Sequence, residues 1–210
     1  MNKLVPILFL LMPAAAALAQ SVPQVPLVLR PADQMQWTLT PMIAKSADMP
    51  DAPSSLPTSI KITKDLSVSR VVLTTGDAKT VELWRVENNT LYSVGNGPRV
   101  TVIRDHPNTS PYPFASSGFF GIENVKPDDE QPEATAFSGV KCRHFRGSLA
   151  TGEEYEAWFE AATGLPKGYR TGTTTLVYEF GPPPGALSLP PEFETAWRVN
   201  QANLRRAGLL

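Results

Sequence analysis

The feature that most constrains the fold is a series of short β-branched runs separated by turn residues between positions 59 and 104. Val68 to Thr75 is one such run, and Gly76-Asp77 closes it. Thr80 to Val86 follows and leads into Asn88-Asn89, a pair that tolerates the positive φ angles of a tight hairpin turn. Runs at this spacing predict consecutive antiparallel strands, because only antiparallel neighbours can be joined by so few residues.

The same pattern predicts further strands on both sides of this region. They cover residues 35–40, 60–62, 91–94, 99–104, 136–146, 155–160 and 173–180. After a proline-rich break, residues 191–206 are expected to form a terminal helix, since the first turn is acidic and the last turn is basic, as the helix dipole favours. Phe193, Trp197 and Leu204 are expected to dock this helix on the sheet. The predicted fold class is mainly β (α+β), an open antiparallel sheet or half-barrel with a C-terminal helix.

Two segments do not fit the strand pattern. Residues 20–34 read as an extended N-terminal arm. Residues 105–135 join a proline-rich stretch to an acidic one, and a loop of this length in a compact domain is either mobile or functional. Residues 35–210 as a whole are expected to form a single β-rich domain.

The hairpin around Thr151-Gly152 allows a prediction of strand register. A two-residue turn there places Phe145 opposite Trp158, and Arg143 opposite Glu160, so that aromatic contact and opposite charge both stabilise the pair.

Aromatic placement gives the candidate ligand-binding residues, which are Trp84, Phe145 and Trp158. Phe145 and Trp158 are expected on a strand face that otherwise carries charged residues, and Trp84 shares a face with Glu82. Large apolar groups on a mixed face can line a ligand groove. The alternative is that these rings lie under the terminal helix or under the 105–135 loop.

Motifs for catalysis are missing from the sequence. It has no G-x-S-x-G nucleophile motif, and His106 and His144 are its only histidines. Cys142 is the single cysteine, so an internal disulfide is impossible, and we expect the thiol to be buried. We therefore expect no enzyme activity and no cofactor.

A copper-handling protein is the weakest alternative. Met35, Met42 and Met49 recur every seven residues, and thioethers favour Cu(I). Cys142 and His144 would complete such a site, although scattered core or loop methionines explain the spacing more simply.

Met1 to Ala19 has the layout of a secretory signal. Lys3 is followed by an apolar stretch, and Ala17-Leu18-Ala19 is a small-x-small cleavage sequence. We therefore expect cleavage after Ala19 and a periplasmic location, with no transmembrane segment elsewhere. Loss of Lys3 leaves 18 basic against 20 acidic side chains, which gives no reason to expect a nucleic-acid partner.

The C-terminal third resembles periplasmic lipoprotein-carrier-like (LolA-like) half-barrels. The resemblance rests on Lys141-Cys142-Arg143-His144-Phe145, then Glu156-Ala157-Trp158-Phe159, Thr163-Gly164-Leu165-Pro166 and Leu189-Pro190-Pro191-Glu192-Phe193. It implies an open half-barrel that holds acyl chains against a concave apolar face. These motifs are mostly turn sequences, so no functional residue of that family can be placed here.

The sequence thus predicts an exported, non-enzymatic protein that binds a hydrophobic small molecule or a lipidated protein. The second hypothesis is a structural or assembly component of an envelope complex, recognised by a protein partner through a sheet edge or the N-terminal arm.

Overall fold

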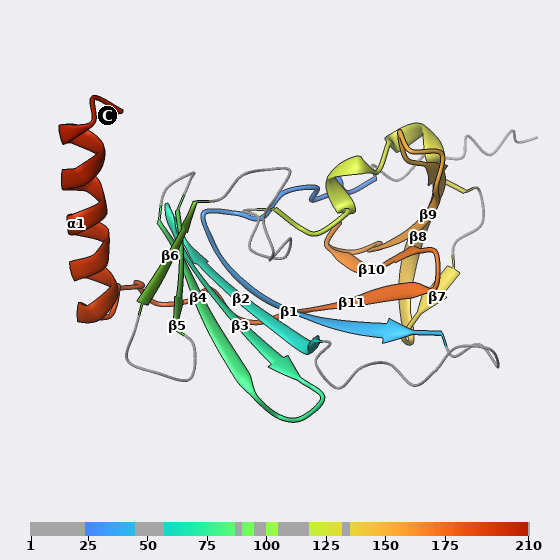
Figure 1. Ribbon diagram of the computed structural model, residues 1–210. Coiled ribbons are helices and arrows are strands. Elements are labelled where there is room, and N and C mark those ends of the chain that lie inside the picture. The colour runs from blue at the N-terminus through green and yellow to red at the C-terminus, as the bar shows by residue number, and fades with distance from the viewer. Residues whose placement is uncertain are drawn as a thin grey trace, which may run out of the picture.

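The computed structural model describes residues 24–44, 57–86, 90–94, 100–104, 118–131 and 135–209. Eleven strands form one antiparallel sheet in the order β6-β5-β4-β3-β2-β1-β11-β10-β9-β8-β7 (Figure 1). The strands are β1 (Gln34–Ile43), β2 (Pro57–Asp65), β3 (Val68–Thr75), β4 (Thr80–Val86), β5 (Thr90–Val94), β6 (Val100–Arg104), β7 (Thr135–Phe137), β8 (Val140–Ser148), β9 (Glu154–Glu160), β10 (Pro166–Thr171) and β11 (Thr174–Phe180).

The sheet consists of two meanders that meet at its centre. Strands β1 to β6 run outward to one edge, and β7 to β11 run inward from the other edge. The first and last strands pair in the middle, with Leu39 opposite Tyr178. Strands β6 and β7 stand at the two ends of this order, so the sheet stays open and curls into the half-barrel that Figure 1 shows. The predicted fold class is confirmed.

The terminal helix α1 (Pro191–Arg206) has the predicted bounds and packs on the outer face of the sheet, at the β3–β6 end. Phe193 is fully buried there, between Trp84 and Val86 of β4, and Trp197 packs against the same cluster. Docking through these two aromatic residues is confirmed. Within the described ranges, no helix is long and apolar enough to cross a membrane.

The strand predicted over 136–146 is interrupted, which corrects that prediction. Ser138 and Gly139 have φ angles of 49° and 77° and form a tight turn that splits the segment into β7 and β8. Strand β10 (Pro166–Thr171) was not predicted, because its proline and glycine have low strand propensity. This strand pairs with β9 on one side and β11 on the other.

The predicted register of the β8–β9 hairpin is wrong by one residue. Leu149 and Glu153 close the hairpin by a backbone hydrogen bond, so its loop contains three residues instead of two. Phe145 therefore lies opposite Ala157, while Trp158 lies opposite His144. Because strand side chains alternate between faces, this slip moves Phe145 and Trp158 to opposite faces of the sheet.

Candidate functional site

The inner, concave face of the half-barrel is the candidate site because it carries most of the buried apolar side chains. Aliphatic residues dominate on β1 to β4, and aromatic residues dominate on β8 to β11. The buried strand residues of this face are Trp37, Leu39, Ile60, Ile62, Val71, Leu73, Leu83, Phe145, Tyr155, Ala157, Phe159, Tyr169, Leu176 and Tyr178. A curved sheet with this lining can hold an apolar group of substantial length if nothing else fills it.

A segment of the chain itself occupies this face. Residues 118–131 contain two short 3-10 turns, η2 (Ile122–Asn124) and η3 (Pro127–Asp129), and lie across the concavity. Three of its side chains, Phe119, Ile122 and Val125, are buried in the inner-face core. Hereafter we call residues 118–131 the plug.

Phe119 is the deepest anchor of the plug. Its ring is fully buried and makes edge-to-face contacts with Trp37 at 5.3 Å, with Phe180 at 5.8 Å and with Tyr178 at 6.3 Å between centroids. Gly121 passes directly over the ring of Tyr169, where a Cβ atom would collide with ring carbons. Its φ of 84° also favours glycine, so the plug is shaped closely to this face.

Tyrosine hydroxyls hold the plug by polar contacts. Tyr178 donates to the carbonyl oxygen of Phe120 at 2.6 Å, and Tyr155 donates to the Asp129 carboxylate at 2.5 Å. Burial raises the pKa of Tyr178 well above its ordinary value and that of Tyr155 to about 12. Both phenols therefore stay neutral and act as donors at physiological pH.

One ion pair ties the end of the plug to the sheet and to the N-terminal arm. Arg143 binds Glu130 through two parallel hydrogen bonds of 2.7 and 2.5 Å, and it also donates to the carbonyl oxygen of Val25 at 2.9 Å. The arm continues along the rim, where the Val28 amide donates to the Gly164 carbonyl oxygen at 2.9 Å. Residues 24–33 have no regular secondary structure.

Glu123 is a plug carboxylate with a strongly raised pKa. Although the residue as a whole is exposed, desolvation of its carboxyl group raises its pKa to about 7, and backbone hydrogen bonds and the charge of Arg30 only partly offset this effect. The carboxyl group, which lies close to Gly118, thus titrates near neutral pH.

The three predicted ligand-binding residues do not lie together. Phe145 is fully buried on the inner face, edge-to-face with Phe159 at 5.3 Å. Trp84 is on the outer face, 6.0 Å from Phe193 of the helix. Trp158 is also on the outer face but at the other end of the sheet, stacked on His144 at 5.1 Å.

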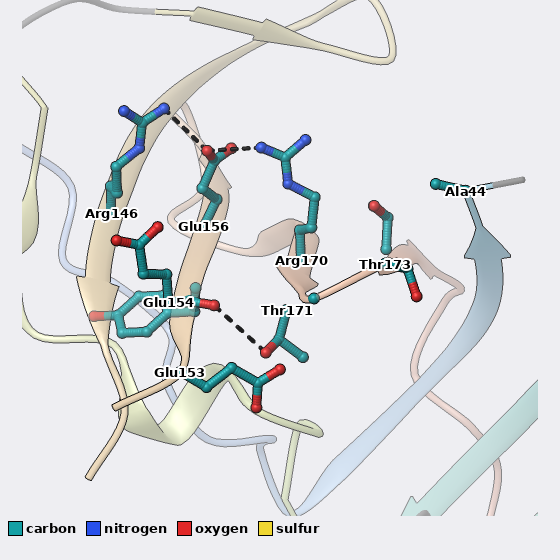
Figure 2. A pocket seen from close by; sticks show the side chains of 11 residues that line it. Ala44, Arg146, Glu153, Glu154, Glu156, Arg170, Thr171 and Thr173 are labelled. Carbon is teal, nitrogen blue, oxygen red and sulfur yellow. Dashed lines mark hydrogen bonds and ion pairs between the residues drawn. The ribbon is translucent and has the colours of Figure 1, made fainter. Parts of the chain in front are cut away.

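The outer face also carries a polar hollow of about 440 Å³ at the end of the β8–β11 strands (Figure 2). Arg146 and Arg170 reach the same oxygen of Glu156, at 2.9 and 2.7 Å. Burial raises the pKa of Glu156, but the two guanidinium groups more than offset this and hold it below its ordinary value. The two arginines and Glu156 therefore form a cross-strand ion network of the kind that exposed sheet faces commonly carry.

The residues considered for a metal site are dispersed. Met35 packs against the inner-face core, whereas Met42 is largely exposed on the opposite face of β1, and Met49 lies outside the described residues. Cys142 is fully buried, as predicted, and burial raises the pKa of its thiol. Among the residues that the structure describes, no group of three or more His, Cys, Asp and Glu side chains could hold a metal ion.

Comparison with known proteins gives structural likeness at low sequence identity. No family model matches the sequence, and no curated protein matches it either. Among solved structures, the lipoprotein LppX of Mycobacterium tuberculosis aligns with a TM-score of 0.44 and 9% identity over 75% of this chain and 90% of that one. At this level of similarity, the function has to be argued from the geometry of the protein itself.

Sequence reasoning offered the 105–135 loop only as an alternative cover for the aromatic residues, and it did not identify residues 118–131 as part of the site. Their apolar run Phe119-Phe120-Gly121-Ile122 was visible inside a segment that otherwise looked like a solvated loop. An apolar run within a long polar loop is a signal for a segment that folds back onto a core, and here three residues of the plug do so.

Proposed function

We propose that the protein binds an apolar ligand, namely the acyl chain of a lipid or of a lipidated protein, on the inner face of the half-barrel. The plug occupies that place when no ligand is bound, and it moves aside when a ligand enters. The protein acts after export, in the periplasm, with the leader removed after Ala19.

The observation that carries this proposal is the kind of element that covers the inner face. A curved apolar face is normally covered by a helix or a second sheet, which brings its own backbone hydrogen bonds. Here the cover within the described chain is mainly the plug, whose regular structure amounts to two turns of three residues each. Such a segment gives up little backbone hydrogen bonding when it leaves, so the cost of opening lies in its buried side chains and in its polar contacts with Tyr155, Tyr178 and Arg143.

A ligand can offset that cost because it buries the same apolar surface of the inner face. Complete burial of one Phe, Ile or Val side chain contributes about 1.5–3 kcal/mol, and the plug buries three of them, Phe119, Ile122 and Val125. An acyl chain gains about 0.8 kcal/mol for each methylene group that it buries, so a long chain can match the plug. A long acyl chain can therefore offset the apolar burial that the plug loses, as a reversible carrier or sensor requires.

Phe145 is the predicted site residue that this proposal uses directly, since it lies on the inner face. Contact of Trp84 and Trp158 with a ligand stays a prediction from the sequence. Alanine substitution at each of the three positions tests it, because a ligand on the inner face should respond to Phe145→Ala and not to either outer-face substitution.

The alternatives are not favoured by any described contact. The arm from residue 24 onward hydrogen-bonds to its own sheet, at Arg143 and Gly164, which is not what a segment reserved for a partner needs. Loss of a co-purifying protein on deletion of residues 20–34 would favour the assembly hypothesis. Copper that stays with the protein through gel filtration would favour the metal hypothesis.

Native mass spectrometry of the protein isolated from the periplasm tests the proposal. The expected result is a mature chain that begins at Gln20 and carries a stoichiometric apolar adduct, which organic extraction then identifies as lipid. A chain that stays free of adduct, both as isolated and after incubation with a total lipid extract, would overturn the proposal.

A further inference from the structure

One amphipathic aromatic residue lies on each of four adjacent strands of the inner face. These are Trp37 on β1, Tyr178 on β11, Tyr169 on β10 and Tyr155 on β9, and all four are at most 2% exposed. We call them the donor row. They form a regular diagonal, because each lies two residues from the position directly opposite its neighbour.

The inner face has two chemically different parts. On one side, β1 to β4 present aliphatic groups such as Leu39, Ile62 and Leu73, which have no polar atoms. On the other side, the donor row places N–H and O–H groups under the plug. Buried Tyr and Trp residues normally find hydrogen-bond acceptors, and a face meant only for hydrocarbon has no use for these groups.

The acceptors that the donor row now uses come from the plug. Tyr178 uses the carbonyl oxygen of Phe120, and Tyr155 uses Asp129. The Nε1–H of Trp37 is buried and has no acceptor within the part of the chain that the structure describes. A buried donor without a partner is costly, so an acceptor that arrives with a ligand would stabilise this site.

We propose that the donor row recognises the ester carbonyl of an acyl glycerol-type lipid, whose hydrocarbon chain lies along the aliphatic half of the same face. This inference rests on the proposed function and specifies its ligand. In the bound state, the ester oxygen takes the place of the Phe120 carbonyl oxygen on Tyr178 and supplies an acceptor to Trp37. A neutral carbonyl fits better than a free carboxylate. Burial and then the negative charges of Glu153 and Glu123 raise the pKa of the neighbouring Tyr169, and the same charges would repel a carboxylate at this place.

The test compares two ligands that differ only at the carbonyl. The probes are 1-lauroylglycerol and its ether analogue 1-O-dodecylglycerol, each titrated calorimetrically below its micelle concentration. In the wild-type protein, we expect the ester to bind at least about fivefold tighter, because one neutral hydrogen bond contributes about that factor and the ester carbonyl accepts from two donors. The ratio of the two affinities is the readout, because both ligands need the same displacement of the plug and that cost cancels.

Tyr178→Phe and Trp37→Phe each remove one donor of the row. Both variants should lower the ester-to-ether ratio toward 1, even where Tyr178→Phe raises both affinities by loosening the plug. Phe159→Leu changes an inner-face ring that carries no donor, so it is the matched control and should keep the wild-type ratio.

The outcomes separate this inference from the function beneath it. Binding of neither probe would overturn the proposed function together with the inference. Equal binding of ester and ether by the wild type would leave the function standing and overturn the inference. An ester preference that survives in both donor variants would also overturn it, because the discrimination would then come from other residues.

Discussion

Removal of the Phe119 side chain should increase the affinity of the protein for apolar ligands while it lowers the stability of the fold. Phe119 belongs to the plug, so Phe119→Ala takes nothing from the sheet surface that a ligand would contact. The substitution weakens only the closed arrangement, in which the ring packs among Trp37, Tyr178 and Phe180.

The size of the effect follows from the burial of the ring. Replacing a fully buried Phe by Ala costs about 3–5 kcal/mol, and the three edge-to-face contacts of Phe119 are part of that cost. If the open state is rarely populated, the apparent dissociation constant falls in proportion to the gain in its population. A loss of about 3 kcal/mol from the closed state thus corresponds to an affinity gain of about two orders of magnitude.

The assay is a fluorescence titration with N-phenyl-1-naphthylamine, run beside chemical unfolding of the same samples. Phe193→Ala is the matched control, since Phe193 is also fully buried but lies on the outer face under the helix. Both variants should lose similar stability, and only Phe119→Ala should gain affinity.

One result would refute the reasoning. If Phe119→Ala loses stability to the same extent as Phe193→Ala and binds the probe no better than the wild type, the plug is a permanent part of the core. Displacement by a ligand would then be excluded as the way into the inner face.

The remaining predictions concern the plug and its ties to the arm. The folded pKa of Glu123 is raised to about 7, so its protonated form contributes stability that is fully present below the unfolded pKa and is lost as pH rises through 7. Glu123→Gln should therefore flatten the fall in Tm between pH 5 and pH 8. Parallel Tm curves for the variant and the wild type would contradict this prediction. Gly164→Ala should lower the free energy of unfolding by about 2–3 kcal/mol in chemical unfolding, because φ at this position is positive and a Cβ atom would overlap an arm carbonyl oxygen. Gly152 is the matched control. It has a similar φ but open space around it, so Gly152→Ala should cost only about 1 kcal/mol. Arg143→Lys loses the two parallel hydrogen bonds with Glu130 and should speed amide hydrogen exchange in both the plug and the arm. If exchange in one of these two segments is unchanged, Arg143 does not hold that segment in place.

Local patterns in the sequence were sufficient for the elements whose signals lie within a few neighbouring residues. The bounds predicted for β3, β4 and α1 are those of the structure. Strand β3 is a β-branched run closed by a turn, and α1 combines an acidic start with a basic end. Such signals act over short stretches of backbone, so they do not depend on what packs against them.

Tertiary structure alone decided the features that bear on function. Strand β10 forms in spite of Pro166 and Gly168 because β9 and β11 pair with it on both sides. One extra residue in the β8–β9 loop placed Phe145 and Trp158 on opposite faces instead of on the same one, since strand side chains alternate with a period of two. The plug became part of the core through contacts with strands far away in the chain, and no local pattern encodes such contacts. The sequence by itself therefore determined an open antiparallel sheet with a terminal helix, whereas long-range packing decided which face is concave and what covers it.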